Sequence, residues 1–486
     1  MTSATKNKSF ILMLATIITG MIVTALNQSV INVALPTIMT DLKITAATAQ
    51  WLTTAFMLTS GILVPISAYL VQKFSYRQLF LAAMISFVAG SFLCAFSGTF
   101  HALLFGRVIQ AIGSGILLPL VMNVFMFSFP VEKRGSAMGI LGLGMILAPA
   151  LGPTVAGLVL QSHTWNILFY GMAIIGAAVT LFAFLTFKFE SPRKAVKLDL
   201  PGVALSTVGF GTLLYGISEI ATKGWTAPEV LTLIGISIVT LFVLVIYSLK
   251  KQDPLLEMRV FKDFNFTYTM IVNTLLTIAL YGGMLLLPIY LQSIRGFTPF
   301  ESGLLLMPGS LVMGLMGIFT GKLFDRVGIK PLAIIGISLM TAVTYLLSKL
   351  SLDTPYLLIM ALYAIRSFGM AFVMMPITSA GLATISKELI PHATALQNTL
   401  RQVAASIGTA VLIVVMTDEA KSYIKSLGSA VDAQSGLLAS IHGVDYAFLV
   451  ATIFGVAALL LSLLFKDKRN PSTAKQEEHE AVLAGK

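Results

Sequence analysis

About fourteen apolar stretches, each long enough to form a membrane-spanning helix, divide this chain along its whole length. A helix needs roughly 20 apolar residues to cross the hydrocarbon core of a bilayer. The stretches lie near residues 10–33, 47–72, 77–98, 101–125, 135–160, 166–187, 200–218, 229–249, 266–292, 302–323, 330–349, 355–383, 393–416 and 445–466. The pattern therefore predicts an all-α polytopic membrane protein with 14 spans.

The amino-acid composition also indicates a membrane protein. Only 11% of the 486 residues are charged and 57% are hydrophobic, whereas soluble globular proteins carry about 25% charged residues. A net charge of +11 would suggest a nucleic-acid partner for a soluble chain. Here the basic residues gather in the loops between apolar stretches, so we expect the lipid bilayer as partner and no nucleic acid. The single cysteine, Cys94, excludes an intrachain disulfide.

The basic residues predict the orientation. With a cytoplasmic N-terminus and alternating loops, 23 of the 32 Lys and Arg residues lie inside and six outside, and Arg107, Arg366 and Arg401 fall within apolar stretches. The positive-inside rule then predicts that both termini are cytoplasmic and that the number of spans is even. The apolar run from Phe10 is too long for a cleaved signal, so we expect a retained first span in a multi-pass plasma-membrane protein. The longest outer loop, 417–444, is expected to form short surface helices.

A weak internal repeat predicts two related halves. The basic segment 68–77 follows the second stretch, and the similar segment 321–330 follows the tenth, 253 residues later. Chance similarity between two short loops is the alternative. Parallel repeats with a substrate site at their interface are a transporter architecture. We therefore expect an N-terminal six-helix bundle (8–190), two inserted helices (199–250), a C-terminal six-helix bundle (265–466) and a cytoplasmic tail (467–486).

Several short motifs occur in order along the chain. They are Leu26–Pro36, Gln50–Leu58, Arg107–Gly113, Ala148–Gly157, Gly224–Trp225, Leu287–Gln292, 321–330 and Asn398–Gln402. Each is weak alone, but together they resemble the fourteen-span drug:H+ antiporter branch of the major facilitator superfamily, over nearly the whole chain. The resemblance implies a major facilitator fold, a transporter rather than an enzyme, and energy from a proton gradient without a cofactor.

The embedded polar residues are candidates for a substrate pathway. Because a charge in hydrocarbon is costly, such residues usually face a bundle interior or an aqueous cavity. The expected pathway residues are Asn27, Gln28, Asn32, Trp51, Tyr290, Gln292, Arg366, Asn398 and Arg401. The alternative for Arg366 and Arg401 is that their side chains snorkel to the cytoplasmic interface.

The resemblance implies a second group that serves proton coupling and conformational change. Its members are Arg107, Gln110, Gly113, Pro149, Gly152, Pro153, Gly157, Gly321, Asp325, Arg326 and Gly328. Arg107, Gln110 and Gly113 fall near one helix face, and the prolines and glycines of 148–157 permit a kink and close helix approach. By the same resemblance, Asp325 belongs to a cytoplasmic gate. The alternatives are a structural arginine satisfied by backbone carbonyls and ordinary tight packing.

Two positions depart from the family pattern. Asn27 stands where the first span usually carries an acid, and Gln72 replaces the acid in the first copy of the gate. Because every Asp and Glu can be placed in a loop or at a span end, a cationic substrate would find no counter-charge, and neutral, zwitterionic or anionic amphiphiles suit the arginines better. The protonation site stays open among Asp41, Glu219, Glu301 and Asp325, near span ends, and His392, which is expected in a loop.

These features predict a monomeric secondary active exporter of small amphipathic molecules that works by alternating access against protons. The sequence has no G-x-x-x-x-G-K-[ST] motif, which argues against ATP hydrolysis. One alternative is an exporter of a single endogenous metabolite or lipid precursor, with or without proton coupling. A membrane sensor or enzyme is disfavoured because the sequence lacks a soluble domain, a metal-ligand cluster and a nucleophile elbow.

Overall fold

The computed structural model describes residues 3–44, 46–130, 134–186, 198–426 and 433–465, which are almost entirely helical and contain no strand. The first helices are α1 (Ser3–Leu42), α2 (Ala46–Lys73), α3 (Tyr76–Ala95), α4 (Phe100–Ser128), α5 (Arg134–Leu160) and α6 (Asn166–Thr186). Two more follow, α7 (Leu200–Lys223) and α8 (Pro228–Lys250). The last group is η2 (Met258–Lys262), α9 (Phe264–Ile289), η3 (Tyr290–Ile294), α10 (Pro299–Val327), α11 (Ile329–Leu346), η4 (Leu347–Lys349), α12 (Tyr356–Ala371), α13 (Met374–Ala383), α14 (Ile390–Ser426) and α15 (Ala433–Ser462).

The helices account for the predicted spans. Thirteen segments of the described chain are long and apolar enough to cross a membrane, and α5, with 27 residues, has the length of a further span. α12 and α13 together form one span, Tyr356–Ala383. The interruption between them begins at Phe372, four residues before Pro376, because a proline ring clashes with the carbonyl at that position in a regular helix.

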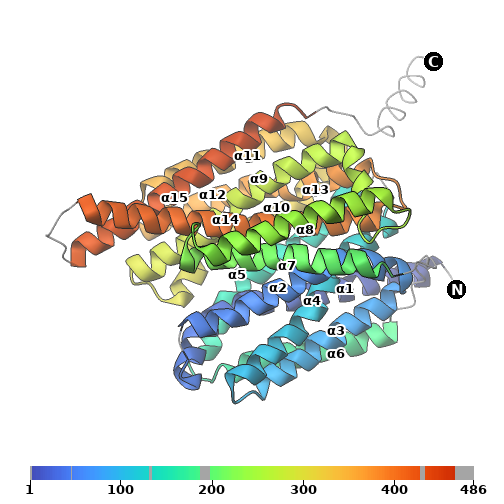
Figure 1. Ribbon diagram of the computed structural model, residues 1–486, viewed down its shortest axis with the longest axis horizontal. Helices are drawn as coiled ribbons and strands as arrows, with labels where there is room; N and C mark the ends of the chain where they lie inside the picture. The colour runs from blue at the N-terminus through green and yellow to red at the C-terminus, as the bar shows by residue number, and fades with distance from the viewer. Residues whose placement is uncertain (1–2, 45, 131–133, 187–197, 427–432, 466–486) are drawn as a thin grey trace.

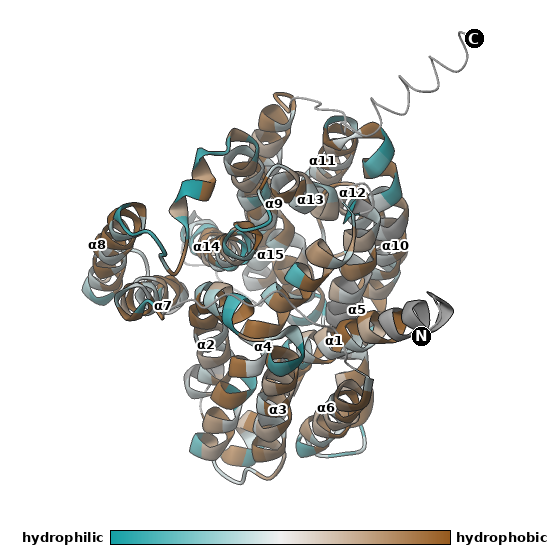
Figure 2. Cartoon of the chain, turned by 90° about the vertical axis from the view of Figure 1, so that its right-hand side faces the viewer, coloured by the Kyte–Doolittle hydropathy of each residue, from teal (hydrophilic) through white to brown (hydrophobic). Residues whose placement is uncertain are grey.

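The two groups of helices meet along two seams. α10 packs against α5, and α14 packs against α2. α7 lies beside the second seam, against α2 and α14, whereas α8 packs mainly on α7 at the edge of the molecule (Figure 2). The start of α1 and the end of α15 lie at the same end of the molecule, as expected for an even number of spans (Figure 1).

The outer face of α8 is apolar and open to the surroundings. Ile238, Val239 and Phe242 are 62%, 65% and 65% exposed. An apolar surface of this kind suits contact with lipid. The inserted helices therefore add to the lipid-facing side of one seam.

Two local predictions were wrong. The segment 417–444 does not form separate short helices: α14 continues to Ser426 and α15 starts at Ala433. Propagating an existing helix is far easier than nucleating a new one, and the helix-forming segment after residue 416 is polar enough to extend beyond the membrane. His392 does not lie in a loop but in the first turn of α14.

Candidate functional site

Arg107 lies fully buried on α4. Its Nη1 donates to Oε1 of Gln110 at 2.9 Å, and its Nε donates to the carbonyl oxygen of Leu52 at 3.3 Å. The guanidinium carbon lies 4.3 Å from the ring centroid of Phe56, within cation–π range. Nη2 has no hydrogen-bond partner among the described residues. A backbone carbonyl therefore satisfies only part of this buried charge.

Gln110 joins Arg107 to the first span. Nε2 of Gln110 donates to Oγ of Ser91 at 2.7 Å, and Nδ2 of Asn27 donates to Oε1 of Gln110 at 3.3 Å. Asn27 is 1% exposed. The amide at the position of the family's acid thus lies inside a polar network of α1, α3 and α4, away from any exposed surface.

Two of the predicted glycines permit close helix approach. A Cβ on Gly113 would lie less than 3.0 Å from a backbone atom of α3. A Cβ on Gly152 would lie 2.7 Å from Cβ of Ser29, so α5 approaches α1 closely there. At Gly157 the nearest atom, Cβ of Phe300 on α10, would be 3.7 Å away, which is ordinary contact. Of these two positions on α5, Gly152 is therefore the one that permits a close approach.

Arg366 is an interior brace of the C-terminal helices. It is 1% exposed. Its Nε donates to Oγ1 of Thr344 on α11 at 3.0 Å, and its Nη2 donates to the carbonyl oxygens of Ala279 and Leu280 on α9 at 2.8 and 3.2 Å. The arginine therefore ties α12 to α9 and α11, and its side chain does not snorkel.

Asp325 forms a contact across the first seam. Its Oδ2 accepts hydrogen bonds from the backbone nitrogen and Oγ of Ser136 at 3.2 and 2.8 Å. Ser136 lies in the first turn of α5, where backbone N–H groups have no helical acceptor. Of its predicted neighbours, Gly321 is buried, Arg326 is exposed, and Gly328 ends α10 with φ of 79°, a conformation that favours glycine.

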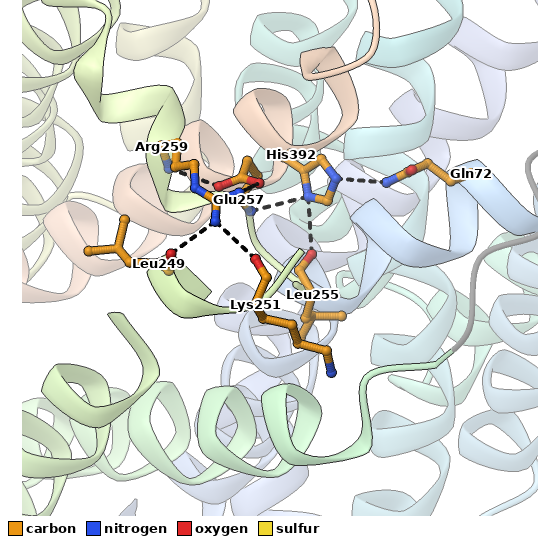
Figure 3. Close-up of polar contacts among 7 residues, drawn as sticks. All are labelled: Gln72, Leu249, Lys251, Leu255, Glu257, Arg259 and His392. Atoms are coloured by element: carbon orange, nitrogen blue, oxygen red, sulfur yellow. Dashed lines mark hydrogen bonds and ion pairs between the residues drawn. The ribbon is translucent and has the colours of Figure 1, made fainter. Parts of the chain in front are cut away.

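Gln72 forms the matching contact across the second seam. Its Nε2, near the end of α2, lies 2.9 Å from Nε2 of His392 on α14 (Figure 3). Nδ1 of His392 lies 3.1 Å from the carbonyl oxygen of Leu255 and 3.3 Å from the backbone nitrogen of Glu257. Where the first copy of the gate is expected, an amide and an imidazole thus make the contact in place of an acid.

The segment that follows α8 is held by Asp199, which is 3% exposed at the start of α7. Oδ1 of Asp199 accepts from Lys251 Nζ and Tyr247 Oη, each at 2.7 Å, and from the backbone nitrogen of Gly202 at 3.0 Å. Its Oδ2 accepts from the backbone nitrogen of Leu255 at 2.9 Å. Burial acts to raise the pKa of Asp199, but these hydrogen bonds outweigh it and lower that pKa, and the bond to Asp199 raises the pKa of Lys251.

The predicted pathway residues of the C-terminal half do not gather at one place. Asn398 is 4% exposed, and its Nδ2 donates to Sδ of Met122 on α4 at 3.0 Å. Tyr290 is fully buried, and its hydroxyl donates to the carbonyl oxygen of Ser351 at 2.6 Å. Gln292 is exposed on η3. Only Asn398 of these three contacts the opposite half.

The remaining pathway residues are more open. Gln28 is partly buried on α1, and Trp51 is 39% exposed with its ring 5.5 Å from that of Tyr215 on α7. Arg401, on α14, is partly buried and interacts electrostatically with Tyr281 on α9. The side chains of three predicted residues lie outside the described part of the structure: Asn32, Pro149 and Pro153.

The acids proposed as protonation sites are engaged near helix ends. Oδ2 of Asp41 accepts from Nε1 of Trp165 at 2.8 Å. Glu219 lies 3.0 Å from Lys223, and Glu301 accepts from the backbone nitrogen at the start of α10 at 2.8 Å. None of these contacts brings an acid to the arginines within the spans.

Sequence reasoning missed Ser136 as the partner of Asp325, His392 as the partner of Gln72, and Asp199 as the residue that holds the segment after α8. An Asp followed two residues later by a proline, before an apolar stretch, is a helix-start signal that indicates the capping part of Asp199's role. No local pattern indicates the two gate partners, because their contacts join segments far apart in the chain.

Comparisons with known proteins agree with this architecture. The family model described as Major Facilitator Superfamily matches residues 17–409. The MFS-type transporter YhcA of Bacillus subtilis (strain 168) is 41% identical over 511 residues, which cover 97% of this chain and 96% of the relative. Lincomycin resistance protein LmrB of Listeria monocytogenes is 36% identical over 440 residues, with 90% and 93% covered. The crystal structure of the human organic anion transporter MFSD10 matches with a TM-score of 0.63 at 14% identity, over 93% of this chain and 98% of that one, which concerns the fold alone.

Proposed function

Because the chain belongs to the Major Facilitator Superfamily, we propose that it is a secondary active exporter of amphipathic small molecules, driven by proton antiport. It is a multi-pass plasma-membrane transporter and not an enzyme. A relative named for lincomycin resistance supports export of toxic compounds as the task.

The proposal is supported by a pair of polar contacts that join the two halves. Asp325 contacts Ser136 on one seam, and Gln72 contacts His392 on the other. Each gate rests on a few hydrogen bonds, worth about 0.5–1.5 kcal/mol when neutral and about 1.5–3 kcal/mol with a charged partner. Contacts of this size bias the equilibrium between two states without locking it, which is what alternating access needs.

In this proposal the bundles 8–190 and 265–466 are the two moving bodies of a monomer. Arg107 and Gln110 take part in coupling, together with Asn27, which lies in their network. Arg366 keeps the C-terminal body rigid. The proton-binding group is not assigned to any single acid.

The test uses inside-out vesicles with an imposed pH gradient and a panel of amphipathic compounds that includes lincomycin. We expect at least one compound to cause proton movement that vesicles lacking the protein do not show, and an uncoupler to abolish its accumulation. If no compound moves protons or accumulates, the proposed function is wrong.

A second candidate is export of one endogenous metabolite or lipid precursor. It is favoured by the engagement of Asp41, Glu219 and Glu301 near span ends, which leaves no acid in contact with the arginines of the described spans. Growth inhibition of expressing and non-expressing cells separates the candidates. Resistance to several unrelated compounds supports drug export, and resistance to none supports the single-substrate transporter.

A further inference from the structure

Of the three arginines within the spans, Arg401 is the one without a hydrogen bond or ion pair to any described residue. Arg107 and Arg366 are fully buried and hydrogen-bonded. Arg401 is partly buried, and it has no hydrogen bond or ion pair among the described residues. An embedded cation is costly and usually faces a bundle interior or an aqueous pathway. The side chain of Arg401 is therefore available to a ligand.

The face of α14 that carries Arg401 points toward the N-terminal half. Nδ2 of Asn123 on α4 donates to Oγ1 of Thr394 at 2.8 Å, and Nδ2 of Asn398 donates to Sδ of Met122 on α4 at 3.0 Å. Positions 394, 398 and 401 share one helix face, because they follow the i, i+4, i+7 spacing. Arg401 thus lies about one turn beyond the last of these closing contacts, on the side away from the cytoplasmic gate.

A second residue on this face also has unused hydrogen-bonding groups. Gln397 lies one turn before Arg401 and is 2% exposed. Neither Nε2 nor Oε1 of Gln397 has a partner in the described structure, and Oδ1 of Asn123 has none either. The large majority of buried side-chain polar atoms in proteins are hydrogen-bonded. The free amide of Gln397, one turn from Arg401 on a helix face that contacts α4, therefore indicates a place where a polar ligand group binds.

We propose that Arg401, Gln397 and Tyr281 bind the carboxylate of an amphipathic anionic substrate. A guanidinium presents paired N–H donors that match a carboxylate, and the glutamine amide and the tyrosine hydroxyl can each donate one hydrogen bond more. No carboxylate of the described chain forms an ion pair with Arg401. This inference rests on the proposed export function and names its substrate class.

The test compares two probes of the same carbon skeleton: dansylated undecanoic acid, which carries a carboxylate, and its methyl ester, which carries no charge there. Binding to the purified full-length protein is followed by dansyl fluorescence. We expect Arg401→Gln to weaken binding of the acid at least tenfold and leave binding of the ester unchanged, and Arg401→Lys to restore most of the affinity for the acid. The matched control is Lys421→Gln, which removes the same charge from an exposed position of α14 and should change neither probe.

The outcomes separate the binding site from the export function. Equal binding of the acid by the wild type and Arg401→Gln, or no binding by the wild type, overturns the site. If Arg401→Gln binds neither probe, Gln397→Ala gives the second measurement. Weaker binding of the acid with unchanged binding of the ester supports the site, and any other result overturns it. If the acid binds through Arg401 but no compound crosses inside-out vesicles, the site stands and the export function fails.

Discussion

Asp325→Ala is expected to shift the protein toward the state in which the cytoplasmic ends of the two halves separate. Oδ2 of Asp325 accepts hydrogen bonds from the backbone nitrogen and Oγ of Ser136 at 3.2 and 2.8 Å. The acceptor belongs to α10 and both donors belong to α5. The two bonds therefore exist only while the halves meet at this seam, and their loss destabilises one state of the transport cycle and not the other.

The size of the shift follows from the geometry of this contact. A hydrogen bond to a charged group contributes about 1.5–3 kcal/mol net. Asp325 is partly exposed and both bonds share one oxygen, so we take this range for the pair and not for each bond. At tenfold for each 1.4 kcal/mol, the ratio of separated to closed protein should rise by about 10- to 150-fold.

The assay is cysteine labelling at Ala137, a small side chain that is 2% exposed beside Ser136. Inside-out vesicles carrying Ala137→Cys, with Cys94→Ser as background, are treated with an impermeant maleimide. The labelling rate follows the fraction of separated protein when opening is fast. Ser136→Ala keeps the backbone bond to Asp325 and should give a smaller increase than Asp325→Ala. Equal rates in Asp325→Ala and the parent would refute the reasoning.

Three further predictions concern the neighbouring contacts. Asn27→Asp should leave ethidium efflux unchanged because the side chain is 1% exposed and bonded to Gln110; increased efflux would place Asn27 in the pathway. His392→Ala should raise maleimide labelling as Asp325→Ala does, because it removes the contact with Gln72, and an unchanged rate would contradict a gate role. Asp199→Asn should cost about 1–3 kcal/mol at pH 7. Since the pKa of Asp199 is lowered, its contribution to stability is present above about pH 4 and lost in more acidic solution. Thermal unfolding of the wild type and Asp199→Asn in detergent, at about pH 7 and below about pH 4, checks this. A stability difference between the two proteins that does not narrow in acid would contradict it.

Hydropathy predicts most of this fold because a bilayer requires a spanning backbone to make its hydrogen bonds within the helix. The predicted stretches 77–98 and 229–249 correspond to α3, Tyr76–Ala95, and α8, Pro228–Lys250. Hydropathy does not predict the structure of segments that lie in water beyond the membrane. The polar end of α14 remains helical to Ser426, and hydropathy carries no signal for a helix there.

The site residues show where sequence reasoning stops. The expected gate positions, Gln72 and Asp325, come from the family resemblance, and the internal repeat pairs them. Their partners His392 and Ser136 lie 320 and 189 residues away along the chain, and only tertiary structure brings them together. The sequence offers the same alternatives for Arg366 and Arg401, because each is a single cation in an apolar stretch. Carbonyl groups of α9 distinguish them, since they satisfy Arg366 and not Arg401.

The segment after α8 connects the inserted helices to the contact between Gln72 and His392. Asp199, which caps α7, holds the backbone of Leu255. The carbonyl oxygen of Leu255 accepts from Nδ1 of His392, and Nε2 of His392 accepts from Nε2 of Gln72. This chain of hydrogen bonds passes from the inserted helices through α14 to α2, and Figure 3 shows its part from Leu255 to Gln72. When the second seam separates, the bond between His392 and Gln72 breaks, while the bonds that join His392 to the segment need not. The inserted helices should therefore move with the C-terminal half, because their polar attachment is to α14, whereas α7 contacts α2 through packing such as that of Tyr215 on Trp51.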